Sequence, residues 1–390
     1  MSADGRTVLA GGRVVTPDGT VDDGTVVLDR DRIDAVDSAT PGTVDVDTTG
    51  RVVLPGIVDL HGDDVERHLF PRADDRVPPE RAVQICDQAN IAAGVTTKCH
   101  ALAFENAPDE NRSLALTETV ADAVTDFRDS GRALTDHRLH LRCELTSTES
   151  IGAVCDRLHE DPVALASLVT HVPGEGQFDS AEAYADRYGG SEAVSGDRMT
   201  ELVRQRRAVP DRTVRARARR VLERATRQQV PIAAHDSADP DTVRQQADAG
   251  VSICEFPVDL AAALTANDVG MTTAMGAPNL VRGESIWDNL STHRAIQSGT
   301  VDVLCSDFRP QSLLKSVFVE TGEPLADRVA RVTAGPADAI GLDDRGRLAP
   351  GARADLLVVD PSPEPRVVRA FVGGREVYRA APAESATRGT

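Results

Sequence analysis

Eight short hydrophobic runs recur along the middle of the chain, and segments with helical spacing separate most of them. Each run is rich in Val, Ile, Leu and Ala and ends at polar residues, as strands of a buried parallel sheet do. Eight β/α units over about 280 residues predict an α/β protein with a (β/α)8 TIM-like barrel. The runs cover residues 57–63, 94–103, 138–145, 163–172, 230–236, 251–257, 271–278 and 301–308.

Both ends of the chain show a different pattern, in which β-branched stretches alternate with Gly and Asp. TVLAGGRVVTPDG near the start and GRLAPGARADLLVVD near the end are examples. Such stretches are typical of short strands joined by turns, so we expect one small β-sandwich built from both chain ends. The predicted division is 1–54 and 341–380 for the sandwich, 55–340 for the barrel and 381–390 for a frayed tail.

One connection in the predicted barrel is much longer than the others. Residues 173–229 contain PGEGQFDSAEAYADRYGG followed by a long Arg-rich helical stretch. Ordinary βα loops are short, and extended loops on the C-terminal face of a barrel usually shape a substrate site. We therefore interpret 173–229 as an insertion that forms a lid.

Potential metal ligands occur where the predicted barrel strands end. Those ends converge on one rim of a barrel, and His61 and Asp63 share a face because they are two residues apart on one strand. Imidazole and carboxylate ligands suit Zn²⁺, Mn²⁺, Fe²⁺ or Co²⁺. Six ligands exceed one tetrahedral site, so we expect two divalent ions, with Glu144 as the bridging ligand. The predicted ligands are His61, Asp63, Glu144, His171, His235 and Asp307.

Each of these residues also has a purely structural explanation. A single His at a strand end is more often hydrogen bonded within the core or a loop, and Asp307 alone fits a helix N-cap before PQSLLKSVF. The occurrence of all six at strand ends favours the metal site. Among the other histidines, we expect structural or supporting roles for His68, His100, His137, His140 and His293.

Composition narrows the classes of partner. The net charge is −19, and Lys98 and Lys315 are the only lysines among 43 basic residues. This surface is poorly suited to nucleic acid or anionic membranes, so we expect neither as a partner. An acidic, lysine-poor composition resembles that of proteins from salt-loving organisms, although a GC-rich genome would also favour Arg and Ala codons.

The cysteines and the apolar segments indicate the compartment. Six cysteines show no CxxC pair, and Cys143, Cys254 and Cys305 fall inside apolar runs, which favours buried thiols. The N-terminus does not read as a signal peptide, and no apolar stretch reaches the length of about 18 residues that a membrane span needs. We therefore expect a cytoplasmic protein.

Several of these features together resemble the amidohydrolase superfamily. The strand-rich start, PGIVDLH, a late strand-end Asp and GRLAPGARADLLVVD are similar to that family over essentially the whole chain. The usual first motif there is His-x-His, whereas this chain has His61-Gly-Asp63, and Glu144 stands where many members use a carboxylated lysine. These departures disfavour a plain hydantoinase or dihydroorotase.

One branch of the superfamily resembles the chain more closely. In order, the chain contains LPGIVDLHGDDVERHLFPR, HRLHLRCEL, SLVTHVPGEGQF, AAHDSA, EFP, MGAPNLVRG and CSDFRP. These motifs are similar to those of diphosphatases that act on α-D-ribose 1-methylphosphonate 5-triphosphate in the carbon–phosphorus lyase pathway. The resemblance implies a phosphorylated ribose substrate and release of pyrophosphate. Asp64 in place of the usual Asn, Lys98 and His100 at a strand end, and GESIWDN after Arg282 depart from the pattern.

The residues agree with phosphoanhydride chemistry. Metal ions acidify a water and neutralise phosphate oxygens, and Asp307 is placed to act as general base. The chain has no GxxxxGK[ST] motif, so we expect Arg side chains to hold phosphates, with a surface ion pair as the alternative for each. Arg72, Arg282 and Arg309 follow strand ends. Gln177 and Asn279 are predicted because they lie inside the matched motifs. The predicted substrate-binding residues are Arg72, Arg142, Gln177, Asn279 and Arg282.

Two other functions stay open. The first is an amidohydrolase acting on a cyclic amide or nucleobase-like ring, and the H-x-D pair and the Arg-bearing strand weigh against it. The second is a non-catalytic binding subunit, which retention of all six candidate ligands argues against. A homodimer is one candidate assembly.

Overall fold

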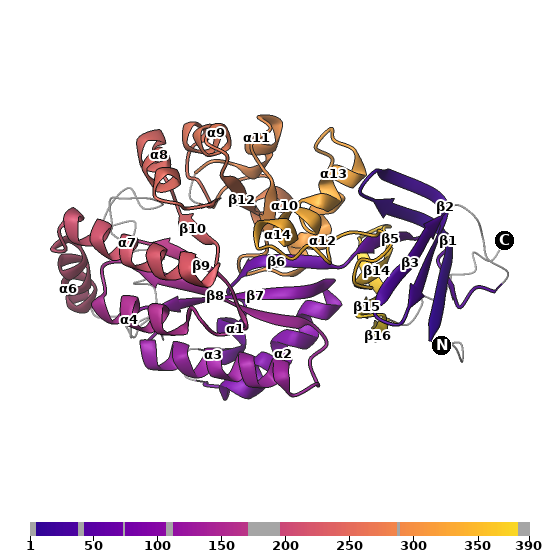
Figure 1. Cartoon of the computed structure of the whole chain (residues 1–390), viewed down its shortest axis with the longest axis horizontal. Coiled ribbons are helices and arrows are strands. Elements are labelled where there is room, and N and C mark those ends of the chain that lie inside the picture. Colours follow the sequence, from indigo (N-terminus) through magenta and orange to yellow (C-terminus); the bar gives the residue numbers. More distant parts are fainter. Residues whose placement is uncertain are drawn as a thin grey trace.

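The computed structural model describes residues 5–37, 43–72, 75–106, 112–170, 196–286 and 289–380. These residues form a β/α barrel and a second sheet beside it (Figure 1). The strands are β1 (Arg6–Thr16), β2 (Gly19–Asp29), β3 (Arg32–Asp37), β4 (Val46–Asp47), β5 (Val52–Pro55), β6 (Ile57–Gly62), β7 (Val95–Phe104), β8 (Asp136–Glu144), β9 (Val163–Val169), β10 (Ile232–His235), β11 (Ile253–Glu255), β12 (Thr272–Gly276), β13 (Val303–Cys305), β14 (Leu356–Asp360), β15 (Arg366–Val372) and β16 (Arg375–Arg379).

Helices follow most of the barrel strands. They are α1 (Val65–Leu69), α2 (Pro79–Ala92), α3 (Leu114–Asp129), α4 (Thr148–Arg157), α6 (Gly196–Arg207), α7 (Asp211–Gln228), α8 (Pro240–Asp248), α9 (Leu260–Asp268), α10 (Ala277–Arg282), α11 (Thr292–Gln297), α12 (Gln311–Val317), α13 (Leu325–Ala330) and α14 (Ala334–Ala339).

The barrel consists of β6 to β13, which lie side by side in chain order and are parallel. Its first and last strands meet at their carboxyl ends. There the Asp63 amide donates to the Asp307 carbonyl over 3.0 Å, and the Asp307 amide donates to the His61 carbonyl over 2.9 Å. Each of the eight hydrophobic runs overlaps one of these strands, so the predicted TIM-like barrel is confirmed as a nearly closed parallel sheet.

Local sequence explains how a helix such as α3 forms and where it packs. The Ser113 hydroxyl accepts from the Leu116 amide over 3.3 Å and satisfies one of the orphan donors at the helix start. The apolar side chains of Val120, Val124 and Phe127 fall on one face and are buried in the core shared with β7 and β8. Burying each such side chain contributes about 1.5–3 kcal/mol.

The second sheet contains strands from both ends of the chain, in the order β16-β15-β14-β5-β1-β2-β3, with β4 beside β1. Strands β1 to β3 (indigo) and β14 to β16 (yellow) accordingly lie on the same side of the barrel (Figure 1). The joining of both chain ends in one sheet is confirmed. A two-layer sandwich and the domain boundaries given above stay predictions.

This terminal sheet adjoins the amino ends of the barrel strands. Just before β6, the Gly56 amide donates to the Asp355 carbonyl over 2.9 Å. The carboxyl ends of the strands therefore lie on the side of the barrel away from the terminal sheet, where α6 and α7 are found (Figure 1). Residues 171–195, which contain the start of the predicted lid, lie outside the described part of the chain.

Two further features concern the cysteines and the helices. All six cysteines are buried and free, as expected for Cys143, Cys254 and Cys305. Among the described residues, no helix is long and apolar enough to cross a membrane.

Candidate metal centre and substrate cavity

The centre of the candidate site is the end of β6, where His61 and Asp63 leave the buried strand. The His61 ring is almost completely buried, and its Nδ1 lies 2.8 Å from Oε1 of Glu255, the last residue of β11. A carboxylate only accepts, so Nδ1 of His61 carries the proton and Nε2 keeps a lone pair. Histidines that bind metals usually have this arrangement with a carboxylate.

His235 joins this pair from the end of β10. Ligand atoms of His61, His235 and Glu255 lie within 4.8 Å of one another, and the rings of the two histidines are 5.5 Å apart. Burial is the main cause that lowers the pKa of His61 well below its ordinary value, and the nearby Arg142 guanidinium adds to this. Both effects keep His61 neutral near pH 7, which is the form that binds a metal.

Two buried acceptors beside these histidines lack a partner among the described residues. Oε2 of Glu255 has no hydrogen bond. His140 donates from Nδ1 to the Leu60 carbonyl over 3.0 Å, so its Nε2 has a lone pair that is also unpaired. Burial lowers the pKa of His140 to about 3, so protonation does not satisfy this nitrogen. Unsatisfied acceptors of this kind, in a set of imidazoles and carboxylates, fit a divalent cation.

A second group of ligand atoms shares His61 with the first. Ligand atoms of His61, Asp63 and Asp307 also lie within 4.8 Å of one another. The backbone pairing between the chain after β6 and the chain after β13 brings the two aspartates together. Two overlapping groups with one common histidine agree with the expectation of more than one ion, although the number of ions stays a prediction.

Three strand ends around this centre have an unusual backbone. The first residue after β10 is Asp236 and the first after β11 is Phe256, while Asp307 is the second residue after β13. Their φ angles are 56°, 52° and 52°. A bulky residue such as phenylalanine rarely adopts this left-handed conformation. Such conformations cost free energy and often cluster at functional sites, although Asp23, Arg30 and Gln229 adopt them elsewhere in the chain.

A cavity of about 680 Å³ opens over the centre and is lined by His61, Asp63, His235 and Asp307. Its walls also carry several cationic side chains, although the chain has a net charge of −19. Arg67 and Arg309 both lie over the Phe308 ring, at 5.0 and 5.5 Å from its centroid. The arginines that line the cavity are Arg67, Arg112, Arg142, Arg282 and Arg309.

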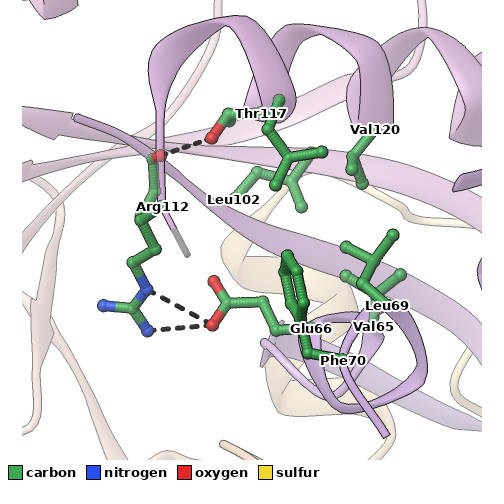
Figure 2. Close-up of a pocket in the computed structure, with 10 residues that line it drawn as sticks. Val65, Glu66, Leu69, Phe70, Leu102, Arg112, Thr117 and Val120 are labelled. Atoms are coloured by element: carbon green, nitrogen blue, oxygen red, sulfur yellow. Dashed lines mark hydrogen bonds and ion pairs between the residues drawn. The ribbon is translucent and has the colours of Figure 1, made fainter. Parts of the chain in front are cut away.

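Arg112 is held at the edge of this cavity by an acidic residue of α1. Its guanidinium donates to Oε2 of Glu66 from Nη2 and Nε, over 3.0 and 3.3 Å. Figure 2 shows Glu66 and Arg112 pointing toward one another beside the apolar side chains of Leu69 and Phe70. The ion pair therefore separates a small apolar pocket from the larger polar cavity.

Among the predicted ligands, Glu144 lies apart from this centre. It is the last residue of β8, as expected, but its Oε1 accepts from the Thr146 hydroxyl over 2.6 Å and its Oε2 lies 4.0 Å from Arg206 of α6. It lines a different cavity, together with Glu105. The structure does not bring Glu144 to His61, and its role as a bridging ligand stays a prediction. His171 lies outside the described residues.

The predicted substrate-binding residues are only partly brought together. Arg142 and Arg282 line the large cavity, and so does Asn279, whose amide is engaged with the backbone of Leu290 and Thr292. Arg72 is not among the residues that line the cavity, and Gln177 lies outside the described residues.

Three further residues at this site, Glu255, Arg67 and Arg112, were not predicted from the sequence. Glu255 ends β11 in the motif EFP, and its position at a strand end is the same signal that identified His235. Arg67 and Arg112 lie on α1 and before α3, and only the packed structure shows that they face the same cavity.

Comparisons with known proteins show the family to which the chain belongs. A family model described as "Amidohydrolase family" matches residues 199–378. The α-D-ribose 1-methylphosphonate 5-triphosphate diphosphatase of Escherichia coli (strain K12) is 32% identical over 318 residues, which cover 80% of this chain and 84% of that protein. The chain belongs to the amidohydrolase family.

Other amidohydrolase relatives and structures are more distant. An imidazolonepropionase of Streptomyces griseus is 29% identical over 368 residues, which cover 88% of this chain and 87% of that protein. The crystal structure of a Xaa-Pro dipeptidase with bound methionine has a TM-score of 0.65 and 15% identity, and the match covers 96% of this chain and 100% of that one. This structural likeness shows the shared fold.

Proposed function

We propose that this amidohydrolase hydrolyses α-D-ribose 1-methylphosphonate 5-triphosphate to the 5-phosphate and pyrophosphate, in the catabolism of phosphonates. The relative from Escherichia coli that carries this activity in its name supports the proposal. The feature that carries it most directly is the cavity over His61, Asp63 and Asp307, which is lined by five arginines in a strongly acidic chain.

The arginines suit a polyanionic substrate. A guanidinium binds phosphate oxygens through two parallel charge-assisted hydrogen bonds, which are about twice as strong as neutral ones. Arg142 is buried, its Nη1 lies 3.9 Å from Asp63, and its Nε has no hydrogen-bond partner among the described residues. Arg142 therefore places an unpaired, buried donor beside the candidate ligands.

Each remaining group of the centre has a role in the reaction. His61, Asp63, His235, Glu255 and Asp307 would hold Zn²⁺, Mn²⁺ or Fe²⁺, with two ions as the expected number. When bound, a divalent metal acidifies a water nucleophile and neutralises phosphate charge. The Asp307 carboxylate takes the proton of the attacking water as general base. The arginines orient the triphosphate so that this water faces the bond that breaks.

The proposal is tested with metal-free protein to which Zn²⁺, Mn²⁺ or Fe²⁺ is added singly. We expect ³¹P nuclear magnetic resonance to show pyrophosphate and the 5-phosphate product only after a metal is added. Reaction in ¹⁸O water shows which phosphorus the water attacks, and we expect label in the 5-phosphate product. Absence of pyrophosphate with every metal, from folded protein, would refute the proposed activity.

A second candidate is hydrolysis of a cyclic amide or nucleobase-like ring. The imidazolonepropionase relative favours it, and so does the Phe256 ring, which lies 5.1 Å from His61 and offers an aromatic surface at the centre. Hydantoin, dihydroorotate and imidazolonepropionate are therefore assayed beside the triphosphate. Hydrolysis of one of these ring compounds, without hydrolysis of the triphosphate, would favour this candidate. Hydrolysis of none of the substrates would favour a non-catalytic role.

A further inference from the structure

A fully buried lysine lies directly beneath the candidate metal centre. Lys98 is inside β7, next to β6 in the barrel (Figure 1), so the expectation that Lys98 and His100 lie at a strand end was wrong. Its Nζ is 2.7 Å from Oδ2 of Asp59 and 2.6 Å from Oδ1 of Asp64. The two aspartates flank the sequence His61-Gly62-Asp63, so the ammonium ion bridges the chain immediately before and after two candidate ligands.

Asp59 connects this ammonium ion to the strand end that carries Asp307. Its Oδ1 accepts from the backbone amides of His61 and Ser306, over 3.3 and 3.0 Å. Its Oδ2 accepts from the Ser306 hydroxyl over 2.5 Å and from Lys98. The Asp59 carboxylate thus contacts the backbone of the candidate ligand His61 and the backbone of Ser306, which precedes the candidate ligand Asp307.

Asp64 fixes the chain on the other side of His61-Gly62-Asp63. It precedes α1, and its Oδ2 accepts from Nδ2 of Asn90 over 2.8 Å and from Sγ of Cys86 over 3.3 Å, both on α2. Burial raises the pKa of Asp64, but the Lys98 ammonium outweighs burial and holds this pKa well below its ordinary value. Burial likewise lowers the pKa of Lys98, and the two carboxylates outweigh it and raise this pKa.

The space around the ammonium ion is shaped for lysine. A Cβ atom added to Gly62 would lie 1.7 Å from Nζ of Lys98 and 2.8 Å from Oδ2 of Asp59, so a larger residue at position 62 would force these two side chains to move. The chain has arginine at all but two of its 43 Lys and Arg positions, yet it has lysine here. An ammonium ion is a compact point charge, whereas the planar guanidinium is larger and would need more room.

We propose that Lys98 is a positioning residue for the metal centre, because its ammonium ion holds His61, Asp63 and Asp307 at the separation that binds a divalent cation. The ion pairs tie β6, β7, α1 and the chain after β13 together at the point where the candidate ligands emerge. This inference rests on the metal dependence of the proposed function and on no particular substrate.

The same ammonium ion already pairs with one member of a neighbouring group of ligand types. Ligand atoms of Asp64, His68 and Cys86 lie within 4.8 Å of one another. Burial is the main cause that raises the pKa of the Cys86 thiol well above its ordinary value, and this thiol donates to Oδ2 of Asp64, so a metal would have to displace its proton to bind there. Lys98 already supplies the positive charge that Asp64 requires.

The test compares the Zn²⁺ affinity of folded wild-type protein and the Lys98→Met variant, measured by competition with a chromophoric chelator. Methionine has a similar length and no charge. Loss of support for metal ligands typically weakens metal binding about 10–100-fold, and we expect this loss for Lys98→Met. The matched control is Arg345→Met, which removes a buried cation that pairs with Asp136 at the opposite end of the barrel. We expect this control to lose thermal stability and to bind Zn²⁺ like the wild type.

A second variant covers the case in which Lys98→Met does not fold, since it leaves two buried carboxylates without their cation. Lys98→Met combined with Asp59→Asn removes one negative charge together with the positive one, and we expect weakened Zn²⁺ binding here too. Wild-type affinity in either folded variant would overturn the inference. A wild-type protein that binds no divalent metal would instead overturn the metal-dependent function itself.

Discussion

Buried charged groups occur at both ends of the barrel, and Asp136 and Asp87 at the amino end are more fully paired than Glu255 and His140 at the carboxyl end. At the amino end, Oδ2 of Asp136 lies 2.6 Å from Arg345 and 3.1 Å from Arg138. Nearby, Asp87 accepts from Nε2 of His137 over 3.0 Å and from the Thr135 amide over 3.0 Å. At the carboxyl end, Oε2 of Glu255 and Nε2 of His140 have no hydrogen bond among the described residues. At the amino end Oδ2 of Asp355 also lacks one, but its Oδ1 accepts from the Gly373 amide over 2.7 Å.

The difference separates a structural cluster from a binding site within one fold. An unpaired buried acceptor costs about 1–3 kcal/mol, and a chain selected only for stability would remove it. At the amino end, Asp136 and Asp87 accept hydrogen bonds from groups of the protein itself. The pairing of Asp136 with Arg345 also joins the barrel to the residues around Arg345. At the carboxyl end, the protein leaves acceptors for a ligand to satisfy. Four predictions test this contrast.

The largest effect is expected at Asp307. Asp307→Asn keeps the size of the side chain but cannot accept a proton, so we expect turnover to fall about 10²–10⁴-fold, in the range of general-base catalysis. Metal content, measured by mass spectrometry after dialysis, should fall much less. Wild-type turnover in this variant would remove Asp307 from the role of base.

The next effect concerns the unpaired carboxylate. Glu255→Gln removes the negative charge next to His61 and His235, and we expect Zn²⁺ affinity to fall about 10–100-fold. The melting temperature of the metal-free protein should change little, because Oε2 has no hydrogen bond to lose. A large drop in that melting temperature with unchanged affinity would place Glu255 with the structural groups.

A smaller effect is expected at the wall of the cavity. Arg142→Gln removes a buried guanidinium that faces the cavity, and we expect the KM for the ribose triphosphate to rise about 10-fold, which corresponds to one hydrogen bond to a charged group. The comparison variant is Arg72→Gln, at a residue that does not line the cavity. Equal effects of the two substitutions would contradict the assignment of Arg142.

The smallest effect is expected at the amino end of the barrel. Asp136→Asn should cost about 1–3 kcal/mol in the free energy of unfolding near pH 7 and leave metal affinity unchanged. Burial raises the pKa of Asp136, but Arg138 and Arg345 outweigh burial and lower this pKa. Its contribution is therefore complete above the unfolded value of about 3.9 and is lost as the pH falls through the folded value.

Thermal melts of wild-type protein and Asp136→Asn check this pH dependence. We expect a constant difference in melting temperature between pH 7 and pH 5, and a difference that closes below about pH 4. A difference that closes on going above pH 5 would show that Asp136 is not the group responsible.

The sequence predicted the barrel and part of its rim because both follow from short-range patterns. Hydrophobic runs identified the eight strands, and strand ends identified His61, Asp63, His235 and Asp307. Glu144 also ends its strand, but the direction of its carboxylate depends on Thr146 and on Arg206, which is distant in the chain. Strand periodicity contains no information about such partners.

The pairing of Lys98 could not be predicted for the same reason. A lysine inside an apolar strand indicates an unusual environment, but its two carboxylates lie 39 and 34 positions earlier in the printed sequence. The expectation of a salt-loving source likewise stays a prediction. Activity and secondary structure at low and at molar KCl would test it, and full stability without salt would contradict it.

The contact between Gly62 and Lys98 also predicts how relatives of this chain differ from one another. A side chain at position 62 would overlap Nζ of Lys98 and approach Oδ2 of Asp59, so we expect substitutions there mainly where the lysine at position 98 has been replaced by a shorter or apolar residue. Conversely, lysine at position 98 can arise only in lineages that already have glycine at position 62. The two positions should therefore covary across homologous sequences, with glycine present wherever the lysine is.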